Sequence, residues 1–361
     1  MRILLTIPKF YPKAGGAETF ALLICRGLTE RGHEVHVATQ AGETFDGYAP
    51  HIVDSLEDIT AIKDEIKPDI SLDWGLNTKA DVHRLGGGVH KAFLKYKFLA
   101  IPWFLRPLKV VETRIHPKHR RLIESEGEIL SEPETKYIAV SHFVKEQLQN
   151  TATIDDSNIR VLPNGVDVAR FKPAGDTAAL RRQLGVSDSD VLCLFVAHNL
   201  RLKNFALLRR VFHRIHRHIP ELKLVLLGKR SPRIRADWFV YAGAVDDPAP
   251  YYQAADIMLH PTFYDACANT VLEALAGGCA VISSDLNGSA EILASGLNGF
   301  VLPVTKRNAV EQWSGLLGWL AQDHKTRRQI GKAATDLAAK HEISNYIDHL
   351  EGILKEFSGT Y

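Results

Sequence analysis

The sequence predicts an α/β protein made of two doubly wound domains, each with a parallel sheet between layers of helices. Short apolar runs with the length of buried strands alternate with amphipathic runs with the length of helices, which is the pattern of βαβ units. The alternation occupies the first half of the chain and begins again near residue 190. A chain of 361 residues also exceeds one ordinary core and suits two domains.

The first half of the chain contains the elements expected of one such domain. Buried strands are predicted at residues 2–7, 33–39, 68–74 and 136–141. Helices are predicted at 17–32, ending at Gly32, and at 141–150, where Ser141 is a suitable N-cap.

The second half repeats the pattern. Strands are predicted at residues 191–197, 222–228, 256–261 and 279–284, and helices at 203–217 and 268–277. Residues 288–295 and three helical segments follow. The stretch between the halves, 158–176, is rich in Pro, Gly and Asp and is the best candidate for a crossing between domains. We therefore expect domains at 1–166 and 167–340 and a last helical segment at 341–361. Because such sheets bind ligands at the carboxyl ends of their strands, a cleft between the domains is the expected site.

Composition excludes several classes of protein. Apolar residues make up 45% and charged residues 24%, as in globular proteins, and the net charge of +2 gives no field that would favour nucleic acid. The four cysteines have neither zinc-site nor redox-motif spacing, which favours reduced thiols in a cytoplasm. The first apolar run is too short for a signal peptide, and no run is long enough to span a membrane.

Two acids, Asp265 and Glu273, stand eight positions apart around the start of the predicted helix 268–277. Eight helical residues span about 12 Å. Amides near the helix start favour an anion between the acids; they are those of Ala266, Cys267, Ala268, Asn269 and Thr270. This layout suits a nucleotide-sugar, with hydroxyls at both ends and a diphosphate between. Alternatively, the Asp only caps the helix and the Glu faces solvent.

Three loops carry weaker signals. Gly15 and Gly16 follow the first strand, where glycine lets a backbone approach phosphate closely, although an ordinary βα turn explains them equally well. Arg201 and Lys203 follow a strand and are suited either to neutralising a diphosphate or to solvent exposure. His90 follows three glycines and is either a polar group on a mobile loop or an ordinary surface or core histidine.

Residues 91–121 combine nine Lys or Arg with one acid and interleaved aromatic side chains. This composition favours an anionic membrane surface. It also suits nucleic acid in general, but no groove-reading or aromatic-sheet motif is present, and a solvated basic face over the cleft is the remaining alternative. The residues expected at the membrane surface are Lys95, Lys97, Trp103, Phe104, Arg106 and Lys109.

Together these motifs resemble the family 4 retaining glycosyltransferases, whose GT-B fold consists of two Rossmann-like domains facing across a cleft, with a carboxyl-terminal helix crossing back to the amino-terminal domain. The resemblance covers nearly the whole chain. It is carried by "GGAE", "RGHEV", "VLPNGVD", the Arg201/Lys203 loop, and the paired acids followed by "ALAGGCAVISSD". Within the family the chain is most similar to the lipopolysaccharide core glucosyltransferases, through "HPTFYDACANTVLEA" and the basic, aromatic segment after "GGGVH".

The resemblance implies a role for each matching position. Gly15 and Gly16 would lie against the donor phosphates and sugar, and Arg201 and Lys203 would bind the diphosphate. Asp265 would contact the donor sugar and Glu273 the ribose, with the backbone of residues 266–270 holding phosphate and sugar oxygens. Lys203 and Asp265 would also take part in catalysis, as would His90, which with Glu18 is assigned to the acceptor side.

The implied activity is retaining transfer of a hexose from a nucleotide-sugar, with UDP favoured, to a lipid-linked or lipopolysaccharide-core acceptor at the inner face of the inner membrane. No metal and no cofactor besides the donor is expected. Two departures bear on this: Asp265 stands where the family usually has Glu, and the Arg201 loop is short. The alternatives are a nucleotide-sugar epimerase of the same fold and a non-catalytic, membrane-peripheral nucleotide-binding protein.

Overall fold

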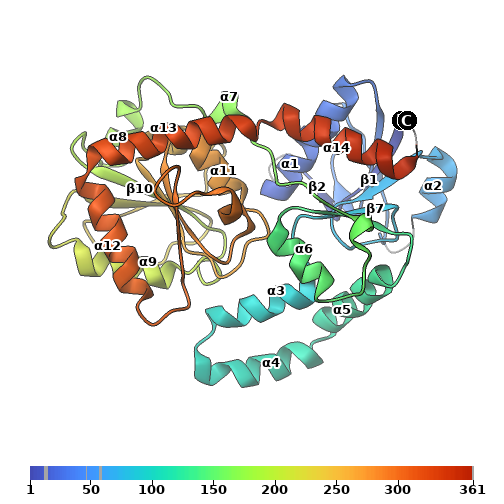
Figure 1. Ribbon diagram of the computed structural model, residues 1–361, viewed down its shortest axis with the longest axis horizontal. Coiled ribbons are helices and arrows are strands. Elements are labelled where there is room, and N and C mark those ends of the chain that lie inside the picture. Colours follow the sequence, from blue (N-terminus) through green and yellow to red (C-terminus); the bar gives the residue numbers. More distant parts are fainter. Residues whose placement is uncertain (12–14, 46, 57–58, 360–361) are drawn as a thin grey trace. The chain divides into compact units, whose positions relative to one another are not determined.

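The computed structural model describes residues 1–11, 15–45, 47–56 and 59–359 (Figure 1). The chain forms two compact units. The amino-terminal unit comprises residues 1–98, 102–164 and 344–361, and the carboxyl-terminal unit comprises 99–101 and 165–343. Each unit is an α/β layer structure with a parallel sheet, so the predicted fold class is confirmed.

The amino-terminal sheet has seven parallel strands in the order β5-β3-β1-β6-β7-β8-β9. Its central strands are almost wholly buried, including the polar residues of β6 and β7. Strand order reverses between β1 and β6, as in other doubly wound sheets. The strands are β1 (Arg2–Thr6), β3 (Glu34–Thr39), β5 (His51–Ile52), β6 (Ile70–Asp73), β7 (Val82–Leu85), β8 (Lys136–Ala139) and β9 (Ile159–Val161), and β2 (Lys9–Phe10) pairs with β4 (Ala41–Gly42).

One helix of this unit, α6, has a side-chain N-cap that the sequence predicted. Ser141 accepts a hydrogen bond from the Val144 amide at 3.1 Å, which confirms it as the N-cap of α6. The first helix ends at Glu30, and Gly32 beyond it has a φ of +83°. The helices are α1 (Gly16–Glu30), α2 (Thr60–Ile66), α3 (His90–Lys97), α4 (Arg106–Ile115), α5 (Pro117–Leu130), α6 (His142–Gln149) and α14 (Ile343–Ser358), with short 3₁₀ turns at Phe98–Ala100, Trp103–Leu105 and Asp156–Asn158.

The carboxyl-terminal sheet has six parallel strands in the order β12-β11-β10-β13-β14-β15. The order reverses between β10 and β13, which are hydrogen-bonded neighbours. In such sheets the switch point is where ligands bind. The strands are β10 (Val191–Val196), β11 (Leu222–Leu227), β12 (Phe239–Gly243), β13 (Ile257–His260), β14 (Ala280–Ser284) and β15 (Phe300–Leu302).

Two apolar cores cover the faces of this sheet. One lies between the sheet and α9 and α12, and the other between the sheet and α10, α11 and α13 (Figure 1). The helices are α7 (Val168–Phe171), α8 (Ala178–Gln183), α9 (Phe205–Ile215), α10 (Ala249–Ala254), α11 (Asn269–Ala276), α12 (Ala309–Gln322) and α13 (His324–Lys340), with a 3₁₀ turn at Gly288–Ile292. The helix expected from Lys203 is α9, and it starts two residues later because Asn204 adopts a left-handed conformation with a φ of +56°.

Candidate active site

The candidate site lies at the carboxyl ends of β10 and β13, the two strands at the switch point of the carboxyl-terminal sheet. The turn after β10 presents Lys203, and the loop after β13 presents Asp265. A backbone hydrogen bond of 2.9 Å from the Phe263 amide to the Leu202 carbonyl joins the two loops. Parallel strands that end at one edge therefore bring together two side chains that are 62 residues apart in sequence.

Lys203 and Asp265 form an ion pair, and each side chain is only about one-fifth exposed, at 21% and 22%. His260, the last residue of β13, is fully buried, and its Nε2 lies 3.3 Å from Oδ2 of Asp265. Burial alone would raise the pKa of Asp265, but the Lys203 ammonium and the His260 ring hold it well below its usual range. Asp265 is therefore an ionised acceptor at neutral pH.

The backbone of Asp265 is held on both sides by the loop that follows β14. Its amide donates to the Leu286 carbonyl at 3.1 Å, and its carbonyl accepts from the Gly288 amide at 2.9 Å. The side-chain oxygen of Asn287 accepts from the Ala268 amide at 3.4 Å. These contacts fix the short segment between the ion pair and the start of α11.

The segment at the start of α11 is buried. Ala266, Cys267 and Ala268 are 2%, 7% and 3% exposed. The Thr270 hydroxyl is buried with no hydrogen-bond partner among the described residues. Asn269 opens the helix. A buried, unpaired hydroxyl in this position is available to a ligand oxygen.

Glu273 lies one turn into α11 and is half-buried. Burial raises the pKa of its carboxyl, while the Tyr252 hydroxyl and the charge of Arg170 act in the opposite direction. Tyr252 is fully buried, and its own pKa is raised by burial and by Glu273. The two acids of the motif thus occupy opposite electrostatic environments.

The remaining predicted residues of the donor site are placed separately. Arg201 is exposed in the turn after β10, two residues before Lys203. Gly15 precedes α1 and Gly16 is its first residue, in the amino-terminal unit. A Cβ atom at Gly15 would lie 2.9 Å from the Glu18 carboxylate, so glycine is what lets this acid fold back over the start of the helix.

His90 begins α3 in the amino-terminal unit, after Gly88, which has a φ of +73°. Its Nε2 lies 2.9 Å from Nδ1 of His119, and its amide donates to the Glu126 carboxylate at 2.8 Å. Burial, followed by His119, Lys97 and Lys118, lowers the pKa of His90 to about 4, so the imidazole is neutral at pH 7. Burial raises the pKa of Glu126 to about 7, although backbone amides at the start of α3 oppose this.

The predicted membrane residues lie on α3, on the 3₁₀ turn Trp103–Leu105 and on α4 (Figure 1). Trp103 and Phe104 are 77% and 64% exposed. They continue into a row of exposed apolar side chains at helical spacing, formed by Leu108, Val111 and Ile115. Lys109 pairs with Glu112, and Arg106, Lys95 and Lys97 lie on the same short segment.

Among the described residues, no group of three or more His, Cys, Asp or Glu is placed to hold a metal ion. Within the same residues, no helix has the length and apolar character needed to cross a membrane.

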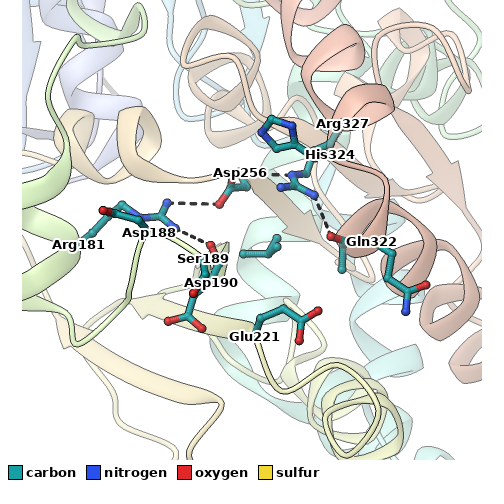
Figure 2. A pocket seen from close by; sticks show the side chains of 11 residues that line it. Arg181, Asp188, Ser189, Asp190, Glu221, Asp256, Gln322, His324 and Arg327 are labelled. Atoms are coloured by element: carbon teal, nitrogen blue, oxygen red, sulfur yellow. Dashed lines mark hydrogen bonds and ion pairs between the residues drawn. The ribbon is translucent and has the colours of Figure 1, made fainter.

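A cavity of about 520 Å³ lies at the amino ends of the strands in the carboxyl-terminal unit, opposite to the candidate site (Figure 2). Asp256, just before β13, lies 3.3 Å from Arg181 of α8 and 3.7 Å from Arg327 of α13. Arg181 also donates to the Asp190 carbonyl at 2.6 Å. These groups satisfy one another, so the cluster ties two helices to the edge of the sheet.

Sequence reasoning missed three residues that shape these regions. His260 could have been suspected from the polar residue and proline that end an apolar strand. Asn287 and Glu126 lie far in sequence from the residues they hold, and no local pattern identifies them.

Comparison with known proteins supports the glycosyltransferase resemblance for the carboxyl-terminal unit. The family described as Glycosyl transferases group 1 matches residues 190–323. D-inositol 3-phosphate glycosyltransferase of Kribbella flavida is 29% identical over 204 residues, and the match spans 50% of this chain and about half (47%) of that relative. The enzyme of the same name from Corynebacterium jeikeium is 25% identical over 95% of this chain and 92% of its own length.

Solved structures with the same fold cover the whole chain. WaaG, a glycosyltransferase involved in lipopolysaccharide biosynthesis, superposes with a TM-score of 0.80 at 18% identity, over 98% of this chain and 99% of WaaG. Anabaena HepE in complex with UDP-glucose gives 0.74 at 14% identity, over 99% and 100%. The predicted resemblance to GT-B glycosyltransferases is confirmed: residues 190–323 match the family described as Glycosyl transferases group 1, and the chain has the GT-B fold.

Proposed function

We propose that this protein is a family 4 glycosyltransferase that moves a hexose from a nucleotide-sugar, a UDP-sugar, to a lipid-linked or lipopolysaccharide-core acceptor with retention. The observation that carries the proposal is the Lys203–Asp265 pair at the switch point of the carboxyl-terminal sheet, with Glu273 following one turn into α11. The relative with UDP-glucose in its structure supports the donor class. WaaG supports a lipopolysaccharide acceptor by analogy, whereas the curated relatives are named for an inositol phosphate.

In this proposal the donor spans the segment between the two acids. Lys203 and Arg201 neutralise the diphosphate as it becomes the leaving group, which is the role that cations play in phosphate binding without a metal. Asp265 accepts hydroxyls of the sugar, and Glu273 accepts hydroxyls of the ribose. The acceptor is assigned to the amino-terminal unit, where the neutral imidazole of His90 and the carboxylate of Glu18 are the candidate groups.

Donor binding is tested by calorimetry with a panel of nucleotide-sugars on the wild type, Glu273→Ala and Glu311→Ala. Glu311 is an exposed acid on α12 and serves as the matched control. We expect the first variant to lose at least tenfold in affinity and the second to lose none. Equal affinity of all three proteins would refute the ribose assignment.

Turnover is tested with Lys203→Ala, for which we expect a loss of two or more orders of magnitude in transfer while the fold persists. Consumption of donor without any acceptor would favour an epimerase. Tight nucleotide binding with no product from any acceptor would favour a non-catalytic binding protein.

The membrane part of the proposal has its own support in the exposed apolar row of α4 and the cations beside it. We expect the protein to sediment with anionic vesicles, less so at high salt. Leu108→Asp should weaken this binding, and Leu297→Asp should not, because Leu297 is equally exposed (63% against 65%) but lies outside the segment. Equal sedimentation with neutral and anionic vesicles would contradict the electrostatic contribution and with it the inner-membrane location.

A further inference from the structure

Behind the Lys203–Asp265 pair lies an imidazole that the proposed chemistry does not use. His260 is 0% exposed, and its Nε2 is 3.3 Å from Oδ2 of Asp265. By hydrogen-bond geometry, neither Nδ1 nor Nε2 of this buried ring has a partner among the described residues. A buried polar atom without a partner is costly, so the ring requires an explanation other than packing.

The charges around this ring are few and come from defined elements. Lys203 reaches it from the turn after β10 and Asp265 from the loop after β13, and its register partner on β14 is the uncharged Ser283. In the free protein the ammonium and carboxylate neutralise each other. Burial and the Lys203 charge both lower the pKa of His260, while Asp265 raises it, so the ring is neutral.

We propose that His260 is a positioning residue that takes up a proton from solvent when a nucleotide-sugar binds, and that the resulting imidazolium holds Asp265 after Lys203 turns to the diphosphate. The inference rests on the proposed function. No bond of the donor is made or broken in this step: one proton adds to an imidazole nitrogen, and the charge on the carboxylate is unchanged.

When the donor binds, its diphosphate and Asp265 compete for the one ammonium group of Lys203. A diphosphate diester brings two negative charges to the turn that carries Lys203, and the same side chain cannot remain fully paired with Asp265. Asp265, which is only about one-fifth exposed, would then be a largely desolvated carboxylate without a cation, which is disfavoured. Besides Lys203, the titratable group beside this carboxylate is His260, already at 3.3 Å. Loss of the lysine's repulsion and persistence of the carboxylate both raise the pKa of the ring in the bound state.

The fixed carboxylate is useful because it must meet sugar hydroxyls in one orientation. A hydrogen bond from a buried imidazolium restrains one carboxylate oxygen and leaves the other free to accept from the donor sugar. In this way binding of the diphosphate would prepare the sugar end of the same site.

The inference is tested by titrating UDP-glucose into the wild type by calorimetry in buffers of different ionisation enthalpy. The donor is used instead of UDP because its diester phosphates do not titrate near neutral pH. We expect uptake of a substantial fraction of a proton at pH 6.5 that falls toward zero at pH 8.5, and a donor affinity that rises correspondingly as the pH is lowered.

His260→Asn keeps a hydrogen-bond donor near Asp265 but cannot take up a proton. We expect it to bind UDP-glucose without proton uptake, whereas His213→Asn, at an exposed histidine on α9, should keep the wild-type uptake. Donor binding by the wild type without uptake, or unchanged uptake in the His260 variant, would overturn the inference and leave the proposed function intact. If the variant does not fold, the wild-type buffer series and pH dependence still decide. Failure of the wild type to bind any nucleotide-sugar would overturn both.

Discussion

The Glu126 carboxyl provides a prediction whose size can be worked out from the structure. It is 8% exposed and accepts the His90 amide at the start of α3. Burial raises its pKa from 4.5 to about 7. The folded protein therefore keeps a proton that the unfolded chain has released, and between these two pH values stability falls by about 1.4 kcal/mol per pH unit. The accumulated penalty is about 3 kcal/mol above pH 7.

The substitution Glu126→Gln removes this titration and retains an oxygen for the amide. Below pH 4.5 we expect the variant and wild type to have equal stability. At pH 8 the variant should be more stable by about 2–3 kcal/mol, which corresponds to roughly a 100-fold smaller opening constant. Glu128→Gln changes an exposed acid on the same helix and should show no such pH-dependent gain.

His90 has the opposite pH dependence. Its pKa is lowered to about 4, so its contribution is fully present above pH 6.5 and is lost on acidification. Because the ring is only half-buried, we discount this contribution to about 1–2 kcal/mol. In the wild type the two groups partly cancel between pH 4.5 and 6.5. Glu126→Gln should therefore reveal a loss of stability as the pH falls.

The assay is hydrogen exchange measured by mass spectrometry on peptides of α3 and α5 between pH 5 and 8, corrected for intrinsic exchange rates. Peptides of β13, in the other unit, report any global effect. A variant that is less stable than wild type at pH 8, or a difference that does not change with pH, would refute the reasoning. Either result would mean that the Glu126 carboxylate is ionised in the folded protein and held by the amides at the start of α3.

Two further pairs of substitutions test the packing that supports the sites. Gly331→Ala in α13 would place a Cβ 2.2 Å from the Gly278 carbonyl, whereas Gly315→Ala in α12 meets no atom within 4 Å. We expect the first to lower and the second to raise the melting temperature, with a difference of about 1–3 kcal/mol between their free energies of unfolding. Equal melting temperatures would contradict the close approach. Arg84→Lys should accelerate amide exchange in α14 about tenfold or more, because a lysine cannot replace the guanidinium that bridges this helix, while Arg160→Lys at an exposed pair should have little effect; matching exchange in the two variants would argue against a special role for Arg84.

Much of the fold could be predicted because its central strands are buried on both faces and therefore read as unbroken apolar runs. The exception is β7, whose sequence contains His83 and Arg84 in the middle of the sheet. Its polar side chains contact groups that are distant in sequence: Nδ1 of His83 lies 3.3 Å from Asp73, and Arg84 donates to Tyr346 at 2.9 Å. A window of sequence shows the polar residues but not these partners, so the strand is not recognised.

The candidate site was predictable to the extent that it depends on local spacing. The interval between Asp265 and Glu273 follows from one loop and one helix, and Lys203 follows from the end of one strand. The arrangement of the ion pair depends on which strands are neighbours, and the position of His260 depends on the turn after β13. Spacing carries neither kind of information, so the imidazole behind the pair was not foreseen.

The two acids of the motif differ in how the protein compensates for their burial, and this difference bears on what each can bind. Asp265 has a cation beside it, and its pKa is depressed, so in the free protein its charge is already compensated. Glu273 has a raised pKa, and the rise is limited mainly by the hydrogen bond of the neutral Tyr252 hydroxyl. A half-buried carboxylate without an adjacent cation gains most from ligand groups that donate hydrogen bonds without bringing charge, which is what a pair of ribose hydroxyls offers. In the proposed function, Asp265 instead gives up a partner when the donor binds. Donor affinity should therefore depend more steeply on Glu273, and catalysis more steeply on Lys203 and Asp265, where charge is rearranged.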